Sequence, residues 1–152
     1  NTSGGRAGRK LNALNLFYAG NPWVGVGEGM FGGAVAMQNQ VLDGIDYFYV
    51  DNYFLKTMVE MGYCGLAAFC LMLLGFLGAA CRALYRKAQD FKAGLDRLFP
   101  LCAGMFAGLC GVIVHCFFEN IFEEPYMMVY FWAIAAMIVY FGFLRKPQEV
   151  ST

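Results

Sequence analysis

Three stretches of about twenty residues each contain no Lys, Arg, Asp or Glu: 62–81, 99–118 and 125–144. A helix needs about 20 mostly apolar residues to cross the hydrocarbon core of a bilayer. Core helices of soluble proteins rarely stay free of charge over such a length. We therefore predict three transmembrane helices and an all-α fold, a polytopic helical bundle.

The overall composition agrees with a membrane protein and argues against several other classes. Only 14% of the 152 residues are charged and the mean hydropathy is +0.50, whereas soluble domains carry about 25% charged residues. A net charge of zero gives no support to a nucleic-acid partner. With one histidine and no CxxC pair, the sequence predicts neither a multi-histidine metal centre nor a zinc site or disulfide framework.

The connections between these stretches predict how the chain is oriented. The loop 82–98 carries five basic residues and the tail 145–152 two more, whereas the hairpin between the second and third stretch carries Glu119, Glu123 and Glu124 and no base. Lys and Arg concentrate on the cytoplasmic side of membrane proteins. We therefore expect the loop and tail to be cytoplasmic, and 1–61 to form an extracytoplasmic region ahead of the membrane region 62–152. We also expect the chain to be the C-terminal part of a longer protein.

Residues 1–61 are predicted to contain an amphipathic helix and a glycine-rich loop. Ala13 and three larger apolar residues recur at helical spacing before Gly20, namely Leu11, Leu14 and Phe17. The stretch "NPWVGVGEGMFGG" follows, and glycine at this density indicates positive φ angles or close backbone approach. A flexible loop is the alternative. A nucleotide loop is disfavoured, because no strand–turn–helix pattern surrounds the glycines.

The stretch "DNYFLKTMVEMG" predicts a helix that begins near Tyr53, with Asp51 or Asn52 as its cap. Lys56 and Glu60 are four residues apart, so they share one helix face. The simplest interpretation is a solvated polar stripe with an ordinary ion pair. The other is that these polar groups border a functional site.

Taken together and in this order, the segments resemble the C-terminal part of the O-antigen ligase and polymerase family of polytopic membrane proteins. That family has an arginine before a helix, then Pro-x-x-Gly-x-Gly, a variable external loop, His-Asn-x-aromatic-Leu, and Glu-x-Gly-x-x-Gly-Leu. The matching residues here are Arg6, then Pro22, Gly25 and Gly27, then Asn52, Phe54 and Leu55, then Glu60, Gly62, Gly65 and Leu66. Asp51 stands where the family often has histidine.

The resemblance implies transfer or polymerisation of oligosaccharides carried on polyprenyl pyrophosphate, without metal or cofactor. It implies a catalytic role for Arg6 as pyrophosphate ligand and for Asp51, which would orient or deprotonate the acceptor hydroxyl. The expected substrate-binding residues are Arg9, Lys10, Gly25, Gly27, Asn52 and Glu60. For Glu60 the alternative is a structural role, in which it pairs with Lys56 or holds a loop. For the three basic residues Arg6, Arg9 and Lys10 the alternative is a solvated or headgroup-binding patch.

The expected partners are a polyprenyl-pyrophosphate-linked glycan donor, a glycan or lipid-linked acceptor, the bilayer and further N-terminal helices of the same protein. The expected location is the bacterial cytoplasmic membrane, with the active face outside. O-antigen, capsule and exopolysaccharide synthesis all remain open, as does the choice between ligase and polymerase. Two alternatives are a transporter, which would need paired ionisable residues inside the spans, and a non-catalytic interaction subunit.

Overall fold

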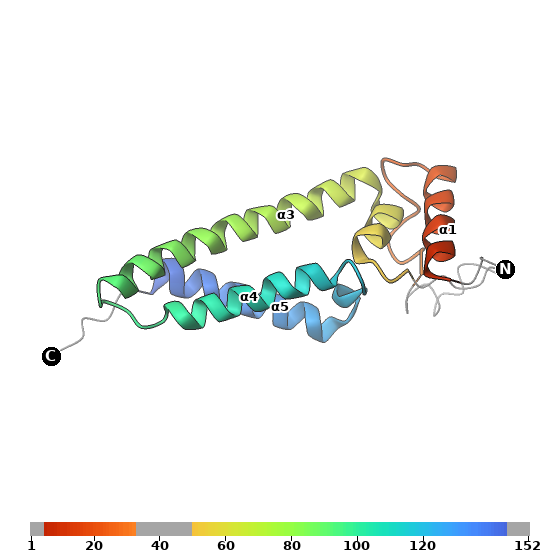
Figure 1. Ribbon diagram of the computed structural model, residues 1–152. Coiled ribbons are helices and arrows are strands. Elements are labelled where there is room, and N and C mark those ends of the chain that lie inside the picture. Colours follow the sequence, from red (N-terminus) through yellow and green to blue (C-terminus); the bar gives the residue numbers. More distant parts are fainter. Residues whose placement is uncertain (1–4, 33–49, 146–152) are drawn as a thin grey trace. The chain divides into compact units, whose positions relative to one another are not determined.

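The computed structural model describes residues 5–32 and 50–145, apart from the side chain of Arg6, and all regular structure in these ranges is helical. The predicted all-α class is therefore confirmed for the described part of the chain. The helices are α1 (Arg6–Ala19), α3 (Tyr53–Lys92), α4 (Phe99–His115) and α5 (Pro125–Val139), with a 3₁₀ turn η1 (Ile121–Glu123) and a π-helical turn η2 (Tyr140–Leu144) (Figure 1).

Two helical segments are long and apolar enough to cross a membrane. They are α3 and the continuous run Pro125–Leu144, made of α5 and η2. α4 is also apolar but has 17 residues, at the short end of what a spanning helix needs. Two membrane-length helices are thus established, and the third transmembrane helix stays a prediction.

The described residues form two compact units, and the predicted division after residue 61 into an extracytoplasmic and a membrane region stays a prediction. The first unit comprises 5–32, 50–70 and 115–124, and the second comprises 71–114 and 125–145. Residues 115–124, which connect α4 to α5, pack with the segment that precedes the first apolar stretch and so belong to the first unit. The candidate site residues of the described chain therefore all belong to the first unit.

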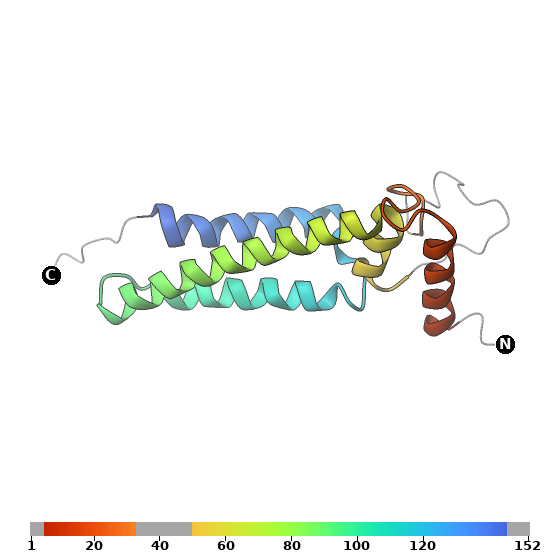
Figure 2. The same ribbon diagram turned by 90° about the horizontal axis from the view of Figure 1, so that it is seen from above.

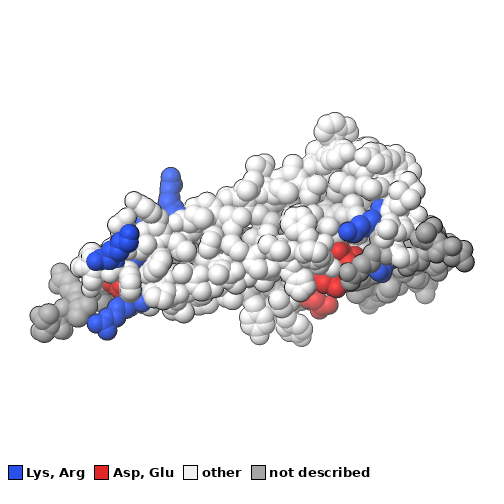
Figure 3. Space-filling view, in the orientation of Figure 1, with Lys and Arg blue, Asp and Glu red and all other residues white. Residues whose placement is uncertain are grey.

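In the second unit, the later part of α3 lies beside α4 and α5 (Figures 1 and 2). Phe76 contacts the rings of Phe131 and Trp132, and Gly142 allows close approach to Ala83. α3 extends to Lys92, so that much of the predicted loop 82–98 is helical. Lys and Arg side chains gather at one end of these helices, next to a surface without charged side chains on the drawn face (Figure 3).

The first unit has a small apolar core to which α1 contributes one face. Ala13 and Phe17 are buried there with three residues from other segments, Phe31, Val50 and Val59. Leu11 was expected on the same face but is 60% exposed. The buried face of α1 thus keeps Ala13 and Phe17 of the predicted face, gains a contact from Leu16 and leaves Leu11 exposed.

Candidate functional site

A break in α3 is the first element of the site. Gly62 has a φ of +68°, which L-residues with side chains rarely adopt, and so interrupts the helix. In an uninterrupted helix the N–H groups of Tyr63 and Cys64 would donate to the carbonyls of Val59 and Glu60, four residues earlier. The break releases these four backbone groups, which need other partners because buried backbone groups are costly when unpaired.

The glycine-rich loop supplies all four partners. Tyr63 N–H donates to the Pro22 carbonyl (2.9 Å), Cys64 N–H to Trp23 (3.3 Å), Val26 N–H to Val59 (3.0 Å) and Gly27 N–H to Glu60 (2.9 Å). Gly25 and Gly27 both have positive φ angles, and a Cβ at Gly25 would overlap the backbone of Glu60. The loop is therefore bonded to the broken helix and is not free. Its glycines allow the close contact between the loop and the helix backbone, and they do not line the pocket described below.

Asn52 joins the start of α3 to the segment after α4. Its side-chain oxygen accepts from Leu55 N–H (2.9 Å), which confirms the predicted helix cap. Its amide nitrogen donates to the Phe117 carbonyl (3.2 Å), and Tyr53 N–H donates to the Cys116 carbonyl (2.8 Å). Phe54 and Phe117 stack with ring centroids 4.4 Å apart. These contacts fix residues 116–118 against the motif.

Lys56 lies at the centre of a buried charge cluster. Its ammonium is 3.2 Å from both carboxylate oxygens of Glu60 and 3.7 Å from Glu123 Oε1. Glu60 also accepts a hydrogen bond from Phe31 N–H (3.2 Å). Lys56 and Glu60 are 7% and 6% exposed, so the interpretation as a solvated stripe is wrong, although the predicted ion pair is present. Burial raises the pKa of Glu60 above its usual value, against the opposing effects of Lys56 and the Phe31 N–H.

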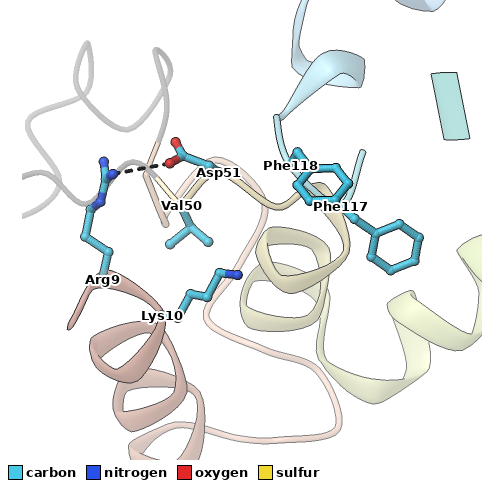
Figure 4. Close-up of a pocket in the computed structure, with 6 residues that line it drawn as sticks. All are labelled: Arg9, Lys10, Val50, Asp51, Phe117 and Phe118. Atoms are coloured by element: carbon cyan, nitrogen blue, oxygen red, sulfur yellow. Dashed lines mark hydrogen bonds and ion pairs between the residues drawn. The ribbon is translucent and has the colours of Figure 1, made fainter. Parts of the chain in front are cut away.

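Arg9 and Asp51 meet in a cavity of about 40 Å³ (Figure 4). The Arg9 Nη2 atom of α1 is 3.2 Å from Asp51 Oδ2, which lies just before α3. The Asp51 side chain is only 13% exposed, whereas that of Arg9 is 31% exposed. Lys10, Val50, Phe117 and Phe118 complete the lining. The cavity thus holds a cation and a carboxylate that are far apart in the sequence.

The structure brings together some predicted site residues and separates others. Asp51, Arg9 and Lys10 line the cavity. Asn52 is the neighbour of Asp51 in the sequence, but its side chain caps α3 and bonds to the Phe117 carbonyl. Glu60 is held by Lys56 and Phe31, as its structural alternative states, and is not a lining residue. The backbone of Arg6 begins α1, one turn before Arg9, and its side chain lies outside the described part of the chain.

Sequence reasoning missed Phe117, Phe118 and Lys56, the first two as cavity walls and the third as the centre of the buried cluster. A signal existed for the phenylalanines, because they are the last residues of the second apolar stretch and precede the acidic hairpin. The sequence offers no comparable signal that Lys56 pairs with Glu123, since such a contact depends on the fold.

Comparisons with protein-family models, with curated proteins and with solved structures give no match for this chain. A guanidinium can bind a phosphate oxygen, and a carboxylate can accept a proton or orient a hydroxyl. Arg9 Nε is buried without a hydrogen-bond partner in the described structure, which leaves one donor of this guanidinium for a ligand.

Proposed function

We propose that this chain is part of a bacterial cell-envelope glycosyltransferase that ligates or polymerises oligosaccharides carried on polyprenyl pyrophosphate. The observation that carries the proposal is the Arg9–Asp51 pair in one cavity. The motif segments of the resemblance also meet in this unit, because the glycine loop bonds to the helix at Glu60 and Asn52 caps the same helix.

The proposed reaction uses both members of the pair. Arg9, with Lys10 beside it, binds a phosphate of the donor and stabilises the charge that develops on the leaving group. Asp51 accepts the proton of an acceptor hydroxyl as its oxygen attacks the anomeric carbon. The bond between the anomeric carbon and the pyrophosphate oxygen breaks, and polyprenyl pyrophosphate leaves with the electron pair. The same role, which the resemblance implies for Arg6, stays a prediction, because the Arg6 side chain lies outside the described part of the chain.

The membrane arrangement is part of the proposal. In it α3, α4 and the run Pro125–Leu144 all cross the cytoplasmic membrane, and the site lies on the outer side. The basic residues that follow the first apolar stretch support this orientation by the positive-inside rule. Single-cysteine labelling in whole cells tests it, in a variant without native cysteines. A cysteine at Glu119 should react with an impermeant maleimide and one at Lys92 should not, and the reverse pattern would contradict the orientation.

The catalytic part of the proposal is tested in the full-length protein with Arg9→Ala and Asp51→Asn. Surface polysaccharide is analysed by gel in a strain that lacks the native gene, and protein abundance is measured in the same membranes. Both variants should lose long-chain or ligated product by more than tenfold at normal abundance. Arg82→Ala, which removes an exposed cation of α3, is the matched control and should give wild-type ladders.

Wild-type ladders from both site variants would remove the proposed catalytic roles. That result would favour a non-catalytic interaction subunit. The transporter alternative has less support, because both buried lysine clusters of the described chain, around Lys56 and Lys87, lie outside the stretches 62–81, 99–118 and 125–144.

A further inference from the structure

We propose that the exposed ring of Phe118 is a platform for a sugar ring of the acceptor, whose reacting hydroxyl enters the cavity between Arg9 and Asp51. The inference rests on the proposed function and assigns an acceptor-binding role to a residue that the motifs do not contain. Its basis is the size of the cavity, the fixed position of the segment 116–118 and the exposure of Phe118.

The cavity is too small for a whole sugar. Its volume of about 40 Å³ exceeds the 10–15 Å³ that a single water requires on a comparable measure, but it gives room for only a few atoms. A hydroxyl or one phosphate oxygen fits there beside Asp51 and Arg9. The rest of a bound pyranose must therefore lie at the rim, where it meets the cavity walls.

The aromatic wall is held in place by contacts on its far side. The Phe117 ring stacks on Phe54, and its carbonyl accepts from the Asn52 side chain. Figure 4 shows the Phe117 side chain extending away from the Arg9–Asp51 pair. The next residue, Phe118, lines the same cavity and is 60% exposed, so one face of an anchored wall is open to a ligand.

The open ring suits a pyranose. One face of many pyranoses presents several C–H groups with a slight positive charge, and an aromatic ring has a negative face, so the two attract each other. Pockets that bind small molecules commonly combine such apolar walls with a few polar groups that fix the ligand. Here Asp51 and Arg9 supply the polar groups, and Phe118 supplies the wall.

The rival role for an exposed phenylalanine is contact with lipid at the bilayer interface, the region where Trp and Tyr are enriched. The two roles differ in what they require of the side chain. Contact with lipid needs an apolar group, which leucine supplies, whereas packing against a sugar needs an aromatic ring. The matched variants are therefore Phe118→Leu, which keeps apolar character, and Phe118→Tyr, which keeps the ring.

The experiment measures transfer by the purified full-length protein, with donor and acceptor oligosaccharides prepared from the host's own polysaccharide pathway. Phe118→Leu should raise KM for the acceptor roughly three- to tenfold, the range expected for one aromatic contact. KM for the donor should not change, and Phe118→Tyr should keep the wild-type KM for the acceptor. Tyr126→Leu removes another ring, 76% exposed and not part of the cavity lining, and should change neither KM.

A wild-type acceptor KM in Phe118→Leu would overturn the platform, as would a loss of membrane abundance shared by Phe118→Leu and Tyr126→Leu without a KM effect. The same variants distinguish failure of the platform from failure of the proposed function. If Arg9→Ala and Asp51→Asn abolish transfer while Phe118→Leu has no effect, only the platform is wrong. If the first two variants transfer normally, the proposed function itself is wrong.

Discussion

Each unit of the molecule contains one buried lysine between two carboxylates, but the two clusters connect different kinds of segment. In the second unit Lys87 is 1% exposed. Its ammonium is 2.6 Å from Asp96 and 3.9 Å from Asp90. Asp96 also accepts from Leu98 N–H (3.0 Å) at the start of α4. This cluster therefore stabilises the short connection between the consecutive helices α3 and α4.

The Lys56 cluster of the first unit connects segments from three parts of the sequence. Lys56 pairs with Glu60 in its own helix and with Glu123 in η1, and Glu60 holds Phe31 N–H at the end of the glycine-rich loop. The same chemistry is therefore local in one unit and long-range in the other. Only the long-range cluster can set the position of the segments that form the cavity.

Two glycines with positive φ angles repeat this contrast. Gly94 (φ +75°) follows the end of α3, and Leu95 N–H returns to the Asp90 carbonyl (2.9 Å), a common helix ending that involves neighbouring residues alone. A Cβ at Gly94 would meet no atom within 4 Å, whereas a Cβ at Gly62 would overlap the Trp23 carbonyl. Gly94 ends a helix, and Gly62 breaks one so that a distant loop can bind.

The largest expected effect comes from removing the buried cations. Lys56→Met and Lys87→Met should each lower the unfolding free energy by about 3–5 kcal/mol, because each leaves at least one buried carboxylate, Glu60 or Asp96, without its cation. The comparison predicts that only Lys56→Met also reduces glycan product per folded molecule, since it frees the loop and η1. Chemical denaturation in detergent and the gel assay measure the two quantities. Equal loss of product per folded molecule in both variants would contradict the distinction.

The second prediction compares the glycines. Gly94→Ala should cost about 1–2 kcal/mol, the penalty for a left-handed L-residue. Gly62→Ala carries this penalty and also forces the Trp23 backbone to move, which adds about 1–3 kcal/mol for overpacking. Gly75→Ala, at a helical position with open space around it, should be neutral or slightly stabilising. Denaturation of the three variants measures their unfolding free energies. If Gly62→Ala lowers the unfolding free energy no more than Gly94→Ala does, the contact between Gly62 and the loop does not contribute to stability.

The features that local patterns determine were predictable from the sequence. α3 begins at Tyr53 with Asn52 as its cap, α1 ends before Gly20, and the glycines adopt the positive φ angles that their density indicated. Each depends on residues close together in the chain, where capping and backbone preferences operate. α3 is longer than the predicted span, because the polar stretch "RALYRKAQDFK", which suggests a loop, continues the helix.

The composition of the site was less predictable. The contact between Asp51 and the guanidinium of Arg9, 42 residues apart in sequence, has no signal in the sequence. The catalytic role that the resemblance implies for Arg6 stays a prediction, because its side chain lies outside the described part of the chain. Phe118 lines the cavity and Glu123 joins the Lys56 cluster only because residues 115–124 belong to the first unit. Which face of α1 is buried, and which residues meet across such separations, depend on tertiary packing, and the sequence patterns contain no direct information about it.

The smallest expected effect is on the pH dependence of stability, which should have opposite signs for the two clusters. Burial raises the pKa of Glu60 above its usual 4.5, despite the opposing effects of Lys56 and the Phe31 N–H. Burial also opposes ionisation of Asp96, but the hydrogen bonds from Lys87 and Leu98 N–H outweigh it and lower its pKa below 3.8. The folded protein thus binds a proton at Glu60 more readily than the unfolded chain does, and at Asp96 less readily.

Acidification should therefore act in opposite directions on the two sites. As pH falls from 7 through the raised pKa of Glu60, wild type should gain stability relative to Glu60→Gln. The stability from ionised Asp96 is present above pH 3.8 and is lost as pH falls through the lowered pKa, so the advantage of wild type over Asp96→Asn should shrink only below that value. Each change amounts to about 1.4 kcal/mol per unit of pKa shift. Denaturation of both variants from pH 7 to 3 measures the differences, and curves of the same sign would mean that the two clusters do not differ electrostatically.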